Sequence, residues 1–215
     1  MMKNMCLLIV TVMLMALAGC GDDGVSTGNG QPTVTFPHRV GTIWTYDYEK
    51  TEINGIDTTV VSDSVDVVVV GDTLLATGDS ATIWVFRYGH QAVPDTHIVA
   101  MAVDTIKLEW DIESLFGTMV SILWPIDTSL TWVSGDSLTD TTTVSGPVNV
   151  SVRGHSYPNT FWIERRWAGL EESEQTDVWL VPNVGIVWYR FEFEQSMAQP
   201  SKRIQRWELL SYDMP

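Results

Sequence analysis

A two-residue alternation of large apolar and polar side chains constrains this chain more than any other feature of its sequence. In residues 42–49 (TIWTYDYE), Trp44, Tyr46 and Tyr48 occupy every second position, and polar residues fill the positions between them. Successive side chains of a β-strand point to opposite faces, so this spacing predicts a strand with one face in a core and one in water.

The same signal recurs along the chain between Asn-Gly, Gly-Asp and similar pairs, which favour tight turns. The sequence predicts about ten antiparallel strands in one strongly curved sheet or half-open barrel, with a β-sandwich as the alternative. At most one short helix is expected, near 111–123, where apolar residues have helical spacing but a strand is equally compatible. The expected strands cover residues 42–49, 58–70, 81–88, 98–110, 138–144, 148–153, 161–167, 177–181, 186–194 and 202–212.

The first residues have the pattern of a secretory signal. Lys3 precedes an apolar run over 5–18, which is shorter than the roughly 20 residues that a bilayer span needs. The run ends in LAGC at 17–20, which resembles the lipobox of bacterial lipoproteins. The resemblance implies that Cys20 is alkylated by a diacylglycerol, usually with a further N-acyl chain, and becomes the first residue of the mature protein.

This resemblance also implies a location in the cell envelope, with the membrane as a partner through Cys20. Gly21 stands where an inner-membrane retention signal would have Asp, which implies the outer membrane, with the domain periplasmic or surface-exposed. Three segments are then expected: a signal peptide at 1–19, the lipidated cysteine and a flexible tether at 20–35, and a single all-β domain at 36–215.

Charge and motifs exclude several classes of function. The formal net charge is −15, so binding to nucleic acid is not expected. No nucleophile motif, phosphate loop or metal-ligand spacing is found, so we expect no enzymatic activity, no metal and no cofactor. His90, Asp95 and His97 are the only candidates for chemistry, because two histidines flank one short stretch with an acid between them.

Tryptophan gives the clearest functional signal, since the chain has 10. Trp162 and Trp167 are expected on opposite faces of the strand 161–167, so one of them can present an aromatic surface to a ligand. Trp188 in the strand 186–194 is the third candidate. The alternative is that a curved sheet buries these side chains on both faces.

Two longer motifs resemble a pattern shared by uncharacterised bacterial lipoproteins. The opening has the form FPxxxGxxWxY, with Phe36, Pro37, Gly41, Trp44 and Tyr46 at its fixed positions. The later motif has the form WxxPxVGxV and occupies residues 179–187, and the segment 124–132 partly repeats the opening. The resemblance implies no activity and no catalytic residue.

We therefore expect a lipid-anchored, non-enzymatic binding or structural module, with a lipid, a glycan or an envelope protein as its ligand. One alternative is a half-barrel, similar in outline to the Lol lipoprotein carriers, that binds acyl chains in an apolar cavity on its concave face. The second alternative is a hydrolase of envelope polymers that uses His90, Asp95 and His97.

Mass spectrometry of the membrane fraction tests the anchor. We expect the mature chain to begin at Cys20 with its thiol acylated, and Cys20→Ser to release the protein from membranes. The matched control is Cys6→Ser, which changes a cysteine inside the signal and should leave lipidation intact. A mature chain that begins at any other residue contradicts the prediction.

Overall fold

Strands make up almost the whole of the part of the chain that the computed structural model describes. This part comprises residues 36–74, 78, 80–102, 105–109, 119–123, 126, 131–133, 140–196 and 200–215. The strands are β1 (Ile43–Asn54), β2 (Asp57–Leu74), β3 (Ser80–Tyr88), β4 (Asp95–Ala102), β5 (Thr105–Glu109), β6 (Met119–Leu123), β7 (Thr131–Val133), β8 (Thr141–Val152), β9 (His155–Ala168), β10 (Glu172–Val181), β11 (Gly185–Gln195) and β12 (Ser201–Asp213).

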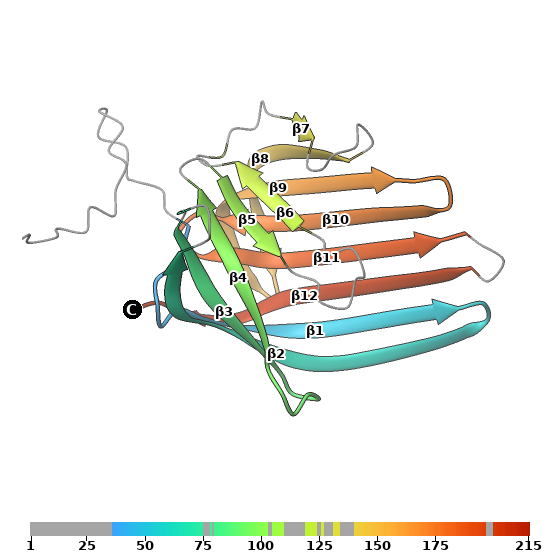
Figure 1. The fold of residues 1–215 in the computed structure, drawn as a ribbon, viewed down its shortest axis with the longest axis horizontal. Coiled ribbons are helices and arrows are strands. Elements are labelled where there is room, and N and C mark those ends of the chain that lie inside the picture. The colour runs from blue at the N-terminus through green and yellow to red at the C-terminus, as the bar shows by residue number, and fades with distance from the viewer. Residues whose placement is uncertain are drawn as a thin grey trace, which may run out of the picture. The chain divides into compact units, whose positions relative to one another are not determined.

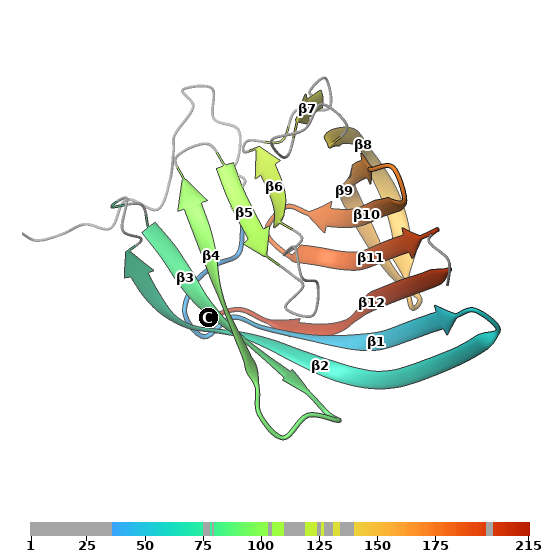
Figure 2. The same cartoon turned by 45° about the vertical axis from the view of Figure 1, so that its right-hand side comes forward.

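All of these strands belong to one sheet, in the order β6-β5-β4-β3-β2-β1-β12-β11-β10-β9-β8-β7 (Figures 1 and 2). Two meanders, β1–β6 and β7–β12, join in the middle, where β1 pairs antiparallel with β12. The predicted all-β class and the single curved antiparallel sheet are confirmed. The β-sandwich alternative is wrong, because the described strands form one sheet whose edges are β6 and β7.

The strand count differs from the prediction for local reasons. Residues 98–110 were expected as one strand, but they contribute to both β4 and β5, which pair as a hairpin. Residues 138–153 were expected to break at Gly146-Pro147, whereas β8 continues through them with a register shift between Ser145 and Val148. A Cβ on Gly146 would lie 2.7 Å from the Thr160 carbonyl oxygen, so only glycine allows this close approach.

The region considered for a helix is a strand where the structure describes it. Met119–Leu123 forms β6 and pairs with β5, while residues 111–118 lie outside the described residues. The signal at 1–19, Cys20, the tether at 20–35 and most of the segment 124–132 also lie outside them. No helix among the described residues is long and apolar enough to cross a membrane.

One face of the sheet carries the core, as the alternation predicted. Trp44, Tyr46 and Tyr48 on β1 are buried side by side with the valines of β2. The largest fully buried side chains come from both meanders: Trp44, Trp207, Tyr46, Tyr189, Phe86, Phe191, Ile163, Leu180 and Leu209. We call this side the buried face and the opposite side the outer face.

Trp207 shows how strongly the sheet curves. Its ring lies 5.9 Å from that of Phe86 and 6.0 Å from that of Tyr88, measured between centroids. Both partners are on β3, which is separated from β12 by β1 and β2. In a flat sheet these strands would lie about 14 Å apart, at roughly 4.8 Å per strand. The sheet therefore curls over its own buried face, as Figure 2 shows for β3 and β4.

The two lipoprotein-like motifs meet in this core. The Trp44 indole N–H donates to the Val184 carbonyl oxygen at 2.7 Å, and the Tyr46 hydroxyl donates to the Ile186 carbonyl oxygen at 2.9 Å. Gly185 has a φ of +100°, and a Cβ there would lie 3.0 Å from Trp44 Nε1. Trp44 and Tyr46 of the first motif thus meet Val184, Gly185 and Ile186 of the second where β1 contacts the β10–β11 turn.

Replacing Trp207 by Ala should strongly destabilise the fold. The change removes a buried ring that contacts β1, β3 and β11, and we expect a loss of about 3–5 kcal/mol in the free energy of unfolding. Chemical denaturation measures it. The control is Ile56→Ala at a side chain that is 99 % exposed, which should change stability by less than about 0.5 kcal/mol. A similar effect for both variants would contradict this account of the core.

Candidate functional site

Three tryptophans form a row across adjacent strands on the outer face. Trp162 on β9 is opposite Trp179 on β10, and Trp179 is opposite Trp188 on β11. The Trp179 and Trp188 rings lie 4.8 Å apart between centroids and are tilted by 32°. Trp162 is 41 % exposed, and the other two are partly buried. We call these three residues the tryptophan row.

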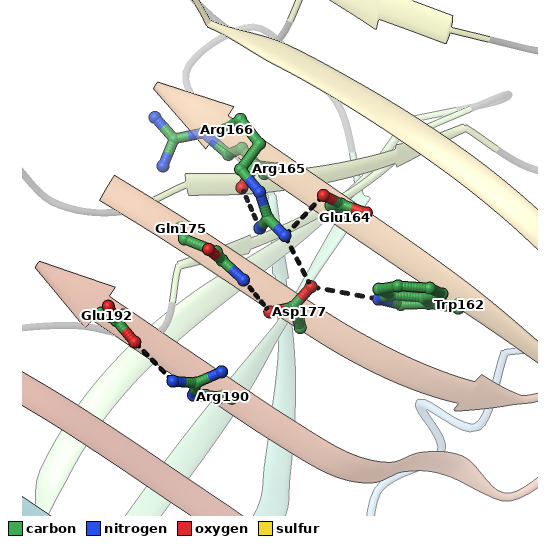
Figure 3. A network of polar contacts seen from close by, with 8 residues as sticks. All are labelled: Trp162, Glu164, Arg165, Arg166, Gln175, Asp177, Arg190 and Glu192. Atoms are coloured by element: carbon green, nitrogen blue, oxygen red, sulfur yellow. Dashed lines mark hydrogen bonds and ion pairs between the residues drawn. The ribbon is translucent and has the colours of Figure 1, made fainter. Parts of the chain in front are cut away.

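Asp177 fixes the orientation of the most exposed member of the row. The Trp162 indole N–H donates to Asp177 Oδ1 at 3.1 Å, and Gln175 Nε2 donates to Asp177 Oδ2 at 2.7 Å (Figure 3). Arg166 also reaches Asp177, at 3.4 Å. The Asp177 side chain is only 6 % exposed although it lies on the outer face, since these side chains cover it. The exposed indole is therefore held in place before any ligand arrives.

Charged pairs flank the row on the outer face. Arg166 pairs with Glu164 at 2.5 Å, and Arg190 pairs with Glu192 at 2.5 Å (Figure 3). Lys202 also donates a hydrogen bond to Glu192, and this bond raises the pKa of the lysine. Pairs of this exposure contribute little to stability, about 0–1 kcal/mol each. Glu164 is two residues from Trp162 on the same face of β9, so its carboxylate lies at the edge of the aromatic surface.

The structure separates the three tryptophans that the sequence singled out. Trp162 and Trp188 are both on the outer face, in the same row, while Trp167 is on the other face of β9, as strand parity predicted. The Trp167 ring lies 3.2 Å from where a Cβ on Gly169 would be. Trp179 was missed as a candidate, although its place before the β10–β11 turn sets it opposite Trp188 once the hairpin register is known.

A second polar cluster lies on the buried face. Arg165 bonds Asp140 through Nε at 2.9 Å and through Nη2 at 2.8 Å, and its Nη1 bonds Glu174 at 3.1 Å. Burial would lower the pKa of the guanidinium, but the hydrogen bonds and charges of the two carboxylates outweigh this and raise it. All three side chains are largely buried. A permanently charged arginine cannot act as an acid or base, so this cluster ties β9 to β10 and to Asp140, the residue just before β8.

The two histidines that were expected to support a hydrolase, His90 and His97, contact different residues. His90 Nδ1 lies 2.5 Å from Asp63 Oδ2, and its backbone N–H donates to the same oxygen at 2.7 Å. His97 is buried on β4 with its ring 4.7 Å from that of Phe86. The partner of His90 that the structure shows is therefore Asp63 rather than Asp95. In the described part of the chain, no group of His, Cys, Asp or Glu side chains has the arrangement of a metal site.

The buried face is packed where the structure describes it. Trp44, Trp84 and Trp207 are each at most 2 % exposed, so these three large rings are packed into this face. One hollow of about 410 Å³ lies where β2 ends and β3 begins. It is lined by His38, Asp72, Thr73, Leu74, Ser80, Ala81 and Thr82. Five of its seven lining residues have polar side chains, and the hollow is partly open to solvent, whereas a cavity for acyl chains is enclosed.

No protein-family model matches the chain, and no curated protein matches it. Three solved structures resemble the chain, each with a TM-score below 0.5. A candidate exported protein with a YmcC-like fold from Bacteroides fragilis has a TM-score of 0.42 at 11 % identity, with 84 % of this chain and 99 % of that chain covered. A candidate lipoprotein from Parabacteroides distasonis has a TM-score of 0.41 at 11 % identity, with coverages of 85 % and 100 %. A DUF1329 family protein from Desulfovibrio piger has a TM-score of 0.24 at 10 % identity, with coverages of 79 % and 84 %.

The contact between His90 and Asp63 should make part of the stability depend on pH. Burial alone would raise the pKa of Asp63, but hydrogen bonds from His90 and from backbone N–H groups outweigh it and lower that pKa. The folded-state pKa is below the unfolded one, so the carboxylate stabilises the fold above the unfolded pKa, and this contribution disappears as the pH falls through the folded pKa.

Asp63→Asn should therefore cost less than about 1 kcal/mol near neutral pH, because the pair is partly exposed. The difference from the unchanged protein should shrink as the pH falls below about 4. Urea denaturation at neutral and at acid pH measures it, and His90→Ala should remove a similar contribution near neutral pH. A difference that stays constant over this range would show that the Asp63 charge does not stabilise the fold.

Proposed function

We propose that this protein is a lipid-anchored envelope module that binds carbohydrate on its outer face and does not catalyse a reaction. The observation that carries the binding proposal is the tryptophan row, with Trp162 exposed and fixed by Asp177. The lipobox at 17–20 supports the anchor and, through Gly21, a place at the outer membrane. Cys20 itself holds the protein to the membrane.

The chemistry of the row favours a sugar over other ligands. An aromatic face packs against the apolar C–H face of a pyranose ring, and the hydroxyl groups around that ring need donors and acceptors at its edge. Arg166, Glu164 and Gln175 supply both beside Trp162. The net charge of −15 disfavours acidic polysaccharides, so we infer a neutral or amino-sugar glycan.

The alternatives have less support. An acyl-chain carrier needs an enclosed apolar cavity, whereas the described buried face is filled by Trp44, Trp84 and Trp207. A hydrolase needs groups that converge on one substrate, whereas His90 contacts Asp63 and His97 packs against Phe86. An open aromatic surface with polar side chains at its edge fits binding without chemistry.

Isothermal titration with a panel of neutral and N-acetylated oligosaccharides tests the proposal. We expect Trp162→Ala to weaken binding of the best ligand at least about tenfold, since a buried aromatic contact contributes on the order of 1–2 kcal/mol. The matched control is Trp167→Ala, which removes the same side chain from the same strand on the opposite face. Asp177→Asn keeps the shape but weakens the hold on the Trp162 indole, so a smaller loss is expected.

Equal loss of affinity in the Trp162 and Trp167 variants would show that the row is not the binding surface. Absence of heat with every glycan of the panel would overturn carbohydrate as the ligand class.

A further inference from the structure

The first half of β2 is a free edge inside the meander. β2 pairs with β1 from Asp57 onward, but its pairing with β3 begins only at Val65. Residues 57–64 therefore have β1 on one side and no described strand on the other. Figure 1 shows this stretch beside β1 at the lower rim of the sheet, where β3 and β4 have turned away.

The hydrogen-bonding pattern identifies the backbone groups that face this free side. The Gly89 N–H donates to the Ser64 carbonyl oxygen at 3.1 Å, so the backbone groups of Ser64 point toward the β3 side. In an antiparallel ladder the direction alternates with each residue, so the N–H and C=O groups of Thr58, Val60 and Ser62 also point that way. Those of Thr59 and Val61 point toward β1.

This edge lacks the features that normally prevent strand addition. Natural edges are blocked by Pro, Lys, a bulge or an inward charge. The segment Thr58-Thr59-Val60-Val61-Ser62 has no charge and no Pro, and its residues favour extended backbone. Val60 is 56 % exposed and Val61 is 36 % exposed. An edge of this kind is a template for a further strand.

The charged residues at the two ends of this edge indicate which kind of strand it binds. Asp57 and Asp63 bracket the uncharged segment and lie on the same side of β2, because they are an even number of residues apart. In an antiparallel partner strand, the residues opposite them are also six positions apart on one face. Opposite charges at such cross-strand positions are favourable. The net charge of −15 also favours a cationic partner segment.

A second copy of this chain fits the edge poorly. Symmetric antiparallel pairing centred on Val60 would set Asp57 of each copy opposite Asp63 of the other, and like charges at these positions are destabilising. Each copy would also bring a net charge of −15.

We propose that residues 57–63 of β2 bind an extended segment of a partner protein, with basic residues six positions apart around a β-branched stretch, by adding an antiparallel strand to the sheet. The N–H and C=O groups of Thr58, Val60 and Ser62 make the backbone bonds. The negative charges of Asp57 and Asp63 select the basic ends, and Asp63 does so while it also bonds His90. This site is separate from the tryptophan row, so it does not depend on the proposed carbohydrate binding.

The test uses the full chain in mild detergent and the fluorescein-labelled peptide Lys-Thr-Val-Thr-Val-Thr-Lys. Its lysines face Asp57 and Asp63, and its valines face Thr59 and Val61. Fluorescence anisotropy should show saturable binding, and the same peptide with glutamate at both ends should bind at least about tenfold more weakly. Hydrogen exchange should slow at the amides of Thr58, Val60 and Ser62 when the lysine peptide is bound.

Val60→Pro is the decisive variant, with Val60→Thr as its matched control. Proline removes an N–H that points away from β1 and so leaves the β1–β2 ladder bonds in place, which edge strands tolerate. We expect the proline variant to lose peptide binding, and the threonine variant and Trp162→Ala to retain it. The exchange measurement on the unchanged chain keeps the proposal testable if the proline variant does not fold.

Three results would overturn the proposal: equal binding of the lysine and glutamate peptides, unchanged binding by Val60→Pro, or no protection at the three amides with millimolar peptide. Concentration-dependent self-association that Val60→Pro abolishes would assign the edge to a second copy instead.

Discussion

A single sheet with no described helix to cover it can bury one of its faces only by curling over itself. This requirement accounts for the placement of the largest side chains. Trp207 on β12 contacts Phe86 and Tyr88 on β3, although β1 and β2 lie between these strands. Trp44 stacks on Trp84, with centroids 4.9 Å apart. Large aromatic rings span the interior of such a curve where aliphatic side chains would leave voids.

The sequence was most informative where one physical pattern dominates. Alternation in 42–49 predicted which side chains of β1 are buried, because the period of a strand is fixed by its backbone. It also separated Trp162 from Trp167 correctly. It could not reveal that Trp162, Trp179 and Trp188 align, since this depends on the pairing of three strands and on the register shift beside Trp179. Register is set by turns and packing that a single strand does not contain.

Local sequence patterns likewise could not predict which residues the polar side chains would bond. Asp95 lies between His90 and His97 in the sequence, yet the residue that bonds His90 is Asp63, which is 27 positions away. Asp140 and Arg165 are 25 positions apart and meet only because β8 and β9 pair. The expected break at Gly146-Pro147 failed for a similar reason, since the neighbouring strand supports a bulge there. By contrast, the two lipoprotein-like motifs showed positions that later proved to touch, Trp44 and Gly185.

The position of β1 has a mechanical consequence. β1 lies in the middle of the sheet, paired along its length with β12 on one side and β2 on the other, and Phe36 just before it is buried near Trp84. With Cys20 held in lipid as proposed, any pull between the membrane and the bound ligand enters the domain through this central strand. A pull along the strand strains both ladders at once, in shear, rather than opening them one bond at a time. In that arrangement the proposed anchor pulls on a strand that is held by two ladders.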